Sequence, residues 1–501
     1  MEKLVVIELG ASEITFSKLN FTSNGFFTIE QQIKEPVRIT QDLERDGYIK
    51  SSRIEETISI LRIFRKIMDG EGISKNLCYA DPAISTARNQ IAFLDEIYKT
   101  VSLHFRVLSL DEQVDALHLA CLHSFSGIKG LLCQIGDDSM QLIQYNRRTV
   151  VNSVSIPFGA YNLAEKFNNI TDVSQKMDKM VDFITGAIRE HKWLFELDEE
   201  VEFIGVGKFF EAVGVLCRKS THYPLDIAHN YEITDANFKS IYSLIKTLDI
   251  DKAKKLKGIS SLRADVLASS IAIMKALFNN VYKANVKIST CGEMYGLVAR
   301  SILAQAEKPM LDILGYSLSA INEFYPCGQS MSNIYELSIV LYKQLKVLHR
   351  LNRNYVKILR IAASMCLSGK RIAYSNYEKN GFNVILGSNI YGATHSEILM
   401  AAFVVANQNP DNFNLSDWVR YKDIVGDEDP SAIKKLGLII KIATLLCITG
   451  GNVVKDVNCD ILGDTVILKT TTEKDASLEI SQAMTMYTDF KKIFGKNLQI
   501  L

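Results

Sequence analysis

Two short turns in the chain combine glycine with acidic and hydroxyl side chains, a combination suited to binding phosphate. The first turn lies within residues 7–13 and the second within residues 134–142. Each turn joins two short apolar runs that predict strands, so each is expected to form a hairpin. Successive backbone N–H groups in such a turn can converge on an anion. Two such turns facing one cleft would form a phosphate cradle, although glycines that only make tight turns explain the pattern equally well.

The elements around these turns predict two similar α/β lobes. Helical spacing of apolar residues follows the first turn at 52–68, 89–101 and 111–122. The second glycine hairpin opens about 125 residues after the first and begins a strand meander that leads into further helices. A repeated hairpin followed by helices is typical of two related α/β lobes. We therefore predict a first lobe over residues 1–125 and a second lobe over residues 126–315.

Beyond the second lobe the spacing of apolar residues becomes almost wholly helical. We predict a mostly helical domain over residues 316–501 with a short α/β tail from residue 460. A chain of 501 residues is long enough for two to four domains. Arg263 and Asp265 are expected to pair at the start of a helix in the second lobe. The helices predicted in the last domain are 332–351, 356–367, 394–407 and 433–448.

Composition excludes several classes of protein. Lys+Arg and Asp+Glu are both 57, and such a neutral chain is a poor candidate for binding nucleic acid, which needs a basic surface. The nine cysteines contain no Cys-x-x-Cys motif, which predicts buried free thiols in a reducing compartment. The longest apolar stretch, 436–450, contains Lys441 and is too short to span a bilayer. With no signal-peptide layout at the N-terminus, these features predict a soluble, cytoplasmic protein without nucleic-acid or membrane partners.

Five segments resemble, in their order along the chain, the motifs of the exopolyphosphatase / guanosine pentaphosphate phosphohydrolase (Ppx/GppA) family. The resemblance continues through residues 290–297 and into the helical C-terminal half. It implies an actin-like, ribonuclease H-like two-lobed unit followed by an HD-like helical domain, and it implies homodimers. The family cleaves the terminal phosphoanhydride of polyphosphate or guanosine pentaphosphate with a carboxylate base and a divalent metal. The five segments are 7–13, 80–89, 108–113, 134–142 and 155–165.

Three glutamines stand where the resemblance implies carboxylates. Gln113 corresponds to the catalytic glutamate, Gln141 to the glutamate that ends the second turn, and Gln134 to the aspartate that opens it. An amide cannot accept a proton from water and is a poor ligand for Mg²⁺. Glu8 keeps the acidic character of the first turn, and Glu112 adjoins the lost glutamate. These two are possible stand-ins for the base, although an exposed position on a helix is the simpler expectation for Glu112.

The resemblance also implies which residues of three turns contact phosphate. In the first two turns, acidic Glu13, Asp137 and Asp138 stand where the family has small residues. Two like charges 4 Å apart repel by about 4 kcal/mol at an effective dielectric of 20, so these carboxylates oppose a polyanion. Lys208 replaces a threonine of the family and offsets part of this repulsion. The implied ligand-binding residues are Gly10, Ser12, Gly136, Ser139, Gly205, Gly207 and Lys208.

The helical domain lacks the ligands of a metal site. The histidine–aspartate pair of the family corresponds to Cys366 and Leu367, and its histidine-rich run corresponds to residues 377–380. Without imidazole and carboxylate ligands an HD-type metal site is not expected there. Mg²⁺ is expected as a cofactor only if hydrolysis survives.

Two functions remain open. The first is a non-catalytic or very weakly active protein that binds a phosphorylated ligand, such as polyphosphate or guanosine tetra- or pentaphosphate. Such a protein would act as a homodimer or as the partner of an active paralogue. The second is a working exopolyphosphatase / guanosine pentaphosphate phosphohydrolase that uses rearranged acidic residues. The three glutamines favour the first function, and whether the chain is an enzyme is left open.

Overall fold

The structure of the protein is a computed structural model that describes residues 3–248, 250–253, 255–256, 264–282, 284–302, 312–324, 326, 331–409, 418–426 and 429–501. The predicted Arg263–Asp265 pair falls outside the residues whose side chains are described. The chain forms two compact units. The first contains Met1–Tyr223 and Ala228–Ile313, and the second contains Pro224–Ile227 and Leu314–Leu501.

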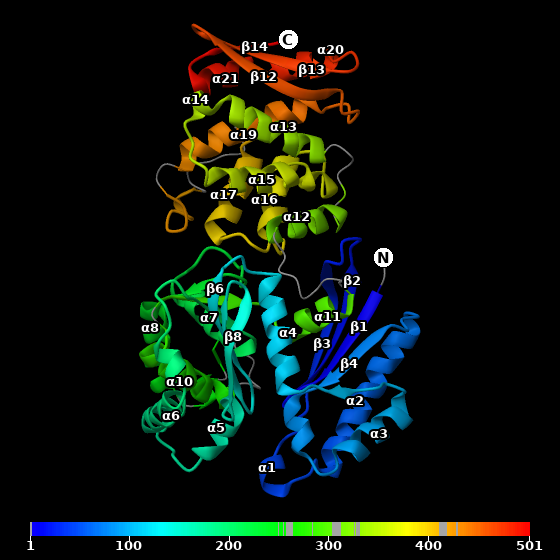
Figure 1. The fold of residues 1–501 in the computed structure, drawn as a ribbon, viewed down its shortest axis with the longest axis vertical. Helices are drawn as coiled ribbons and strands as arrows, with labels where there is room; N and C mark the ends of the chain where they lie inside the picture. Colours follow the sequence, from blue (N-terminus) through cyan, green and yellow to red (C-terminus); the bar gives the residue numbers. More distant parts are fainter. Residues whose placement is uncertain are drawn as a thin grey trace. The chain divides into compact units, whose positions relative to one another are not determined.

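The first half of the first unit is built on a five-stranded sheet in the order β3-β2-β1-β4-β5 (Figure 1). Strand β1 pairs antiparallel with β2 and parallel with β4. Helices α2 and α3 cover one face, and they lie where the apolar spacing predicted helices at 52–68 and 89–101. The elements are β1 (Lys3–Leu9), β2 (Glu13–Phe21), β3 (Phe27–Pro36), α1 (Leu43–Asp46), α2 (Ser51–Gly70), β4 (Asn76–Ala80), η1 (Pro82–Thr86), α3 (Gln90–Val101) and β5 (Arg106–Val107).

Strand β1 shows how this sheet positions functional side chains. Successive side chains of a strand point to opposite faces. Val5 and Ile7 are buried in the core beneath α2 and α3, whereas Val6 packs on the other face with Tyr79. Glu8 therefore shares the face of Val6, away from the apolar core of α2 and α3.

The second half of the first unit is built on a six-stranded sheet in the order β10-β11-β9-β6-β7-β8. Its helices bury one face in a large apolar core. The elements are β6 (Lys129–Ile135), β7 (Met140–Asn146), β8 (Thr149–Ile156), α5 (Ala160–Lys166), α6 (Val173–Arg189), η2 (Lys192–Phe195), β9 (Glu202–Val206), α7 (Lys208–Ser220), β10 (Glu232–Ile233), α8 (Asp235–Lys246), α9 (Ile250–Ala253), α10 (Ala264–Asn280) and β11 (Val286–Ser289).

The two sheets repeat one topology. In each sheet a hairpin strand, β1 or β6, pairs antiparallel with the next strand of the chain and parallel with a later strand. A third strand then pairs antiparallel with the second on the outer side. This confirms the predicted fold of two α/β lobes that each open with a glycine hairpin.

Helices α4 (Leu110–Leu122) and α11 (Glu293–Ile302) lie together between the two sheets (Figure 1). Leu117 of α4 packs against the second sheet, and Leu297 of α11 packs against the first. The two helices cross so closely that a Cβ at Gly296 would lie 1.8 Å from the carbonyl oxygen of Ala116. Residues 293–302 fall within the range 126–315 assigned to the second lobe, but the chain crosses back and they complete the core of the first.

The second unit is mostly helical and ends in a three-stranded sheet ordered β12-β13-β14, as the fold class predicted. Helix α17 forms the centre of this unit's core, because it is buried along nearly its whole length. The elements are α12 (Ile313–Phe324), α13 (Met331–Gln344), α14 (Lys346–His349), α15 (Tyr355–Met365), η4 (Ser368–Arg371), α16 (Tyr377–Leu386), α17 (His395–Ala406), α19 (Asp429–Leu446), β12 (Val454–Leu462), β13 (Thr465–Thr472), α20 (Ser477–Met484), α21 (Tyr487–Phe494) and β14 (Asn497–Ile500).

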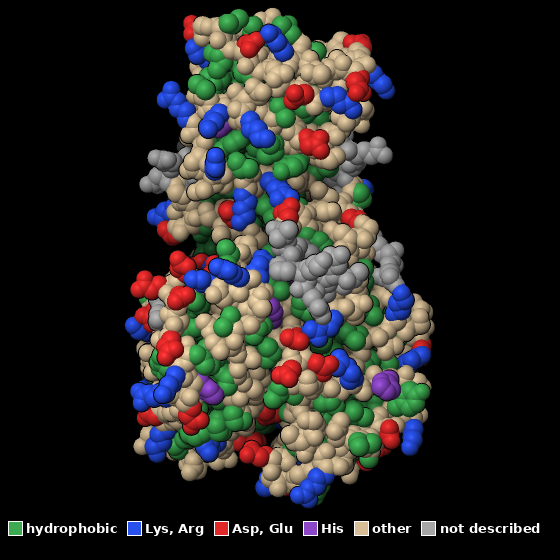
Figure 2. Space-filling model, viewed as in Figure 1, with side chains coloured by type: hydrophobic (Ala, Val, Ile, Leu, Met, Phe, Trp, Pro, Cys, Tyr) green, Lys and Arg blue, Asp and Glu red, His purple; other side chains and the backbone are tan. Residues whose placement is uncertain are grey.

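The surface agrees with the neutral charge balance of the sequence. Figure 2 shows Lys and Arg side chains interspersed with Asp and Glu side chains over the face in view. Among the described helices, none combines the length and apolar character needed to cross a membrane.

The crossing of α4 and α11 generates a stability prediction. We expect Gly296→Ala to lower the free energy of unfolding by about 1–3 kcal/mol or more, because the new methyl group must displace the backbone of Ala116. Urea unfolding followed by circular dichroism would measure the change. The matched control is Gly186→Ala in α6, where nothing lies within 4 Å of the added methyl group. That change should stabilise the protein by about 0.5–1 kcal/mol, as expected for glycine to alanine within a helix. If both variants were stabilised alike, the close crossing would be refuted.

Candidate functional site

The two glycine turns have the same hydrogen-bonded geometry. In the first, the N–H of Gly10 donates to the carbonyl of Glu13 at 3.0 Å, and in the second the N–H of Gly136 donates to the carbonyl of Ser139 at 2.8 Å. A Cβ on either glycine would lie 2.9 Å from the accepting oxygen. Close backbone approach therefore requires glycine at both positions, which gives the glycines a structural reason without excluding a role in binding.

The second turn is also held from behind by the start of α5. The N–H of Ala160 donates to the carbonyl of Gly136 at 2.9 Å, and the N–H of Tyr161 donates to the carbonyl of Asp137 at 2.8 Å. Gly159 permits this contact, because a Cβ there would lie 2.4 Å from the Asp137 carbonyl group. The backbone of the turn is thus fixed independently of its side chains.

A third turn brings a lysine to the first two. Strand β9 ends at Val206, and Gly207, with φ of 92°, precedes helix α7. A positive φ of this size favours glycine. Lys208, the first residue of α7, places its Nζ 3.1 Å from the Oγ of Ser12 and 2.8 Å from Oδ2 of Asp137. The Oγ of Ser12 in turn donates to Oδ2 of Asp137 at 2.5 Å. The structure therefore joins one residue from each of the three turns in a single cluster.

A second pair of contacts ties the lobes together beside this cluster. The Oγ1 of Thr40 donates to Oδ2 of Asp138 at 2.9 Å, and the guanidinium of Arg38 contacts the hydroxyl of Tyr161. The pKa of Asp138 is raised to about 7, chiefly by burial and also by the charges of Asp137 and Asp81, against the opposing effect of the Thr40 hydrogen bond. Both acidic residues of the second turn thus bind a hydroxyl group of the first lobe.

Gln113 and Gln141, two of the glutamines for which the resemblance implies carboxylates, form a hydrogen-bonded pair of amides. The Nε2 of Gln141 donates to Oε1 of Gln113 at 3.1 Å and lies 2.9 Å from the Oγ of Ser155. The Nε2 of Gln113 donates to Oε2 of Glu293 at 3.0 Å. Gln113 and Gln141 are 6% and 2% exposed, and the buried Oε1 of Gln141 has no hydrogen-bond partner. Gln134 lies opposite Gln141 in the register of β6 and β7. The amides therefore bond to one another and to one carboxyl group.

Glu8 lies at the end of β1 on the face that meets α4 and α11. The hydroxyl of Tyr79 donates to its Oε2 at 3.1 Å. Burial raises the pKa of Glu8 to about 7, and the charges of Glu13 and Asp81 add to the effect. Burial and the charge of Glu8 likewise raise the pKa of Glu293 well above its usual range. Burial thus favours the neutral form of both carboxyl groups, and the charge of Glu8 further disfavours ionisation of Glu293.

Two acidic residues near these turns were not predicted. Asp81, at the end of parallel strand β4, accepts a hydrogen bond from the N–H of Ala83 at 2.8 Å, and burial raises its pKa. Side chains at the carboxyl ends of parallel strands commonly line ligand sites, and this signal was available in the sequence. Glu293 lies within the segment 290–297 used for the resemblance, but nothing local indicated that it would meet Gln113.

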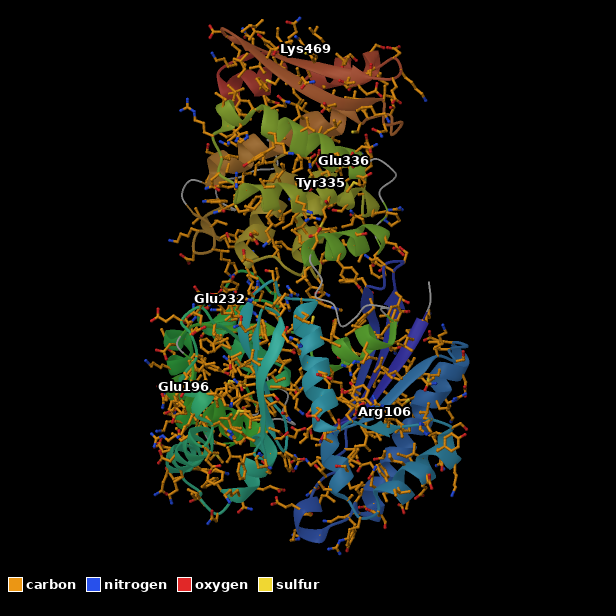
Figure 3. The ribbon with its side chains drawn as sticks, viewed as in Figure 1. Arg106, Glu196, Glu232, Tyr335, Glu336 and Lys469 are labelled. Atoms are coloured by element: carbon orange, nitrogen blue, oxygen red, sulfur yellow. The ribbon has the colours of Figure 1, made fainter. Side chains whose placement is uncertain are left out.

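Glu112 and Gly205, which were predicted to belong to the site, have structural roles. Glu112 forms a capping box with Ser109 at the start of α4 and pairs with Arg106, which Figure 3 labels in the first lobe. The backbone N–H of Ser109 and the charge of Arg106 lower the pKa of Glu112, so it is committed to helix capping and is a poor stand-in for the base. A Cβ on Gly205 would lie 2.2 Å from the ring of Phe210. Gly205 thus lets α7 pack on β9.

The described residues contain no group of three or more His, Cys, Asp or Glu side chains placed to hold a metal ion. In the helical unit, Cys366 is buried. Glu378, in the segment that corresponds to the histidine-rich run, lies 3.5 Å from the Nζ of Lys441. An ammonium group thus neighbours a carboxylate in this part of the unit.

The raised pKa of Glu8 predicts how stability depends on pH. A folded-state pKa of about 7, above the usual 4.5, means that the folded state holds a proton that the unfolded state releases. The contribution of the protonated Glu8 side chain to the free energy of unfolding is complete below about pH 4.5 and is lost as the pH rises through about 7. We expect Glu8→Gln to reduce the loss of stability between pH 5 and pH 8 by about 2–3 kcal/mol, since one pKa unit corresponds to about 1.4 kcal/mol. Denaturant unfolding at both pH values would test this. Glu55→Gln, an exposed change on α2, is the control, and an equal effect of both changes would contradict the prediction.

Comparisons with known proteins relate the chain to a described family and to solved structures. A family model described as the Ppx/GppA phosphatase family matches residues 21–305. A bifunctional 3-dehydroquinate synthase/phosphatase of Fusobacterium nucleatum subsp. nucleatum is 22% identical over 285 residues. That match covers 54% of this chain but only 41% of the relative, so the chain spans about two fifths of the length of that protein.

Solved structures share the fold of the first unit at low identity. The Aquifex aeolicus member of the Ppx/GppA family is 20% identical, with a TM-score of 0.52, and the match covers 61% of this chain and 99% of that chain. An exopolyphosphatase from Cytophaga hutchinsonii is 15% identical, with a TM-score of 0.56, and the match covers 60% of this chain and 97% of that chain. These likenesses show a common two-lobed fold.

Proposed function

This chain belongs to the Ppx/GppA phosphatase family, and from that premise we propose that it binds a phosphorylated ligand at its three turns without hydrolysing it efficiently. The ligand class is a linked phosphate, either polyphosphate or a guanosine tetra- or pentaphosphate. The elements that support binding are the two glycine turns, the Ser12 hydroxyl and the ammonium of Lys208, which stands where the family has a threonine. Backbone N–H groups, a hydroxyl and an ammonium are the donors that hold phosphate in other proteins.

The proposal that hydrolysis is inefficient rests on the buried amides of Gln113 and Gln141. Gln141 donates to Gln113 and Gln113 donates to Glu293, so the two neutral amides are fixed in a row that ends at a carboxyl group. Neither can take a proton from an attacking water molecule. Loss of a general base typically lowers a rate by about 10²–10⁴-fold. A ligand held here would therefore persist, as a sensor or a regulatory partner of an active enzyme requires.

A second candidate function is hydrolysis with Glu8 as the base, and one observation favours it. The pKa of Glu8, raised to about 7, suits proton transfer at neutral pH. The F. nucleatum relative also has phosphatase in its name. The family chemistry uses a divalent metal, but the described residues show no group of three ligands that fits one. For this reason we derive no metal-assisted step and place this function second.

The hydrogen bond between Gln113 and Glu293 suggests a sharper test than restoring a single carboxylate. Gln113→Glu alone would place two carboxyl groups at hydrogen-bond distance. The exchange Gln113→Glu with Glu293→Gln keeps one amide–carboxyl hydrogen bond and returns the carboxylate to α4. We expect this double variant, in which the Gln141 amide still donates to position 113, to release phosphate from polyphosphate at least about 10²-fold faster than the wild type. A colorimetric phosphate assay with Mg²⁺ or Mn²⁺ would measure the rates, and guanosine pentaphosphate would serve as the second substrate.

Each result of this experiment separates the two functions. A wild type that turns over at about 10 s⁻¹, the typical enzyme rate, would contradict the proposed function. Loss of that activity in Glu8→Gln would then assign the base to Glu8. A wild type that is inactive, with activity gained in the exchanged variant, would support a binding protein that lost its base. Thermal unfolding of every variant would show that the differences do not come from misfolding.

A further inference from the structure

Ser12 and Lys208, the donors proposed to bind phosphate, already bind the side-chain carboxylate of Asp137. Oδ2 of Asp137 accepts from the Oγ of Ser12 at 2.5 Å and from the Nζ of Lys208 at 2.8 Å. The two donors also lie 3.1 Å from each other. The side chains of Asp137 and Lys208 are only 11% and 19% exposed. One carboxylate oxygen is thus shared by a hydroxyl and an ammonium that come from two other turns.

A carboxylate oxygen and a phosphoryl oxygen accept hydrogen bonds from the same partners. Ammonium and hydroxyl donors bind both anions with short, charge-assisted bonds. Ser12 has a single hydroxyl hydrogen, which it donates to Asp137, so a phosphoryl oxygen can receive this bond only when Asp137 releases it. A phosphate near Asp137 would also face a like charge, which adds electrostatic repulsion to the competition.

We propose that Asp137 is an internal anion that occupies the phosphate-binding donors Ser12 and Lys208, so that a linked phosphate binds only by displacing its side chain. This inference rests on the proposed function and names the residue that sets the affinity of that site. Asp137 therefore selects against weakly charged phosphates and favours ligands whose charge and length allow them to compete for Lys208.

The backbone of the turn does not depend on the Asp137 side chain. The Asp137 carbonyl is held by the N–H of Tyr161, and the turn itself is closed by Gly136 and Ser139. Asp137 is also absent from the residues with positive φ. Asparagine or alanine can therefore replace it without backbone strain, which makes the side chain accessible to test by substitution.

The adjacent residue offers a matched control. Asp138 is also acidic and also binds a hydroxyl of the first lobe, but its hydrogen bond goes to Thr40. Asp138→Asn at pH 8 removes a charge from the same turn without removing the carboxylate that holds Lys208. Comparison with Asp137→Asn thus separates release of the donors from a general change in charge.

The experiment is calorimetric titration of the full-length chain with tripolyphosphate at pH 8. We expect Asp137→Asn and Asp137→Ala each to bind at least about tenfold more tightly than the wild type, and Asp138→Asn to gain clearly less. In a Lys208→Met background the same Asp137 substitutions should produce no gain, because the released donor is missing. Such dependence on Lys208 is not expected if Asp137 only supports the turn.

The remaining outcomes overturn the inference in distinguishable ways. A wild type that binds tripolyphosphate as tightly as Asp137→Asn would refute the internal anion and leave the proposed function standing. An equal gain from Asp138→Asn, or a gain that persists with Lys208→Met, would show that only net charge matters. If the wild type and both Asp137 variants fold but none binds tripolyphosphate, the proposed function is itself wrong and this inference falls with it.

Discussion

The close crossing of α4 and α11 is the contact on which the arrangement of the first unit depends. It has room only for glycine at position 296, where the backbone of α11 lies against the carbonyl of Ala116. One helix packs its apolar face on the first sheet and the other on the second. Because interiors are close-packed, this pair sets the spacing of two sheets whose strands make no ladder with each other. The glycine turns at the ends of β1 and β6 can therefore meet.

The same helix pair decides the chemistry beneath the turns. Gln113 projects from α4 and Glu293 from the first turn of α11, and their hydrogen bond is a direct result of the crossing. Where the resemblance implies a carboxyl group at position 113, the structure has an amide that binds a carboxyl group from a different helix. That carboxyl group is buried near Glu8, and burial raises the pKa of both groups. At this crossing the two-lobed fold therefore buries a carboxyl group supplied by α11 and an amide supplied by α4.

In the second turn, both acidic side chains are bonded to groups within the protein. Asp137 pairs with Lys208, and Asp138 bonds to Thr40 across the lobes. A turn that would otherwise present only N–H groups and small side chains to a ligand instead links the two lobes. These contacts stabilise the closed arrangement of the turns, and they do so with the groups that a phosphate ligand would need. The contacts that stabilise these turns therefore compete directly with the binding of an anionic ligand.

The sequence by itself determined the fold and the turns. Helical and strand periodicity, and the glycines of the two hairpins, are local properties, so the two lobes and the helical second unit could be predicted from them. Only the tertiary structure decided which side chains meet. Glu293 lies 180 residues from Gln113, and Lys208 lies 71 residues from Asp137. Sequence spacing carries no signal for such contacts, because they depend on how helices and sheets pack. For the same reason Glu112, adjacent to Gln113 in sequence, caps the start of α4, since neighbours on a helix point in different directions.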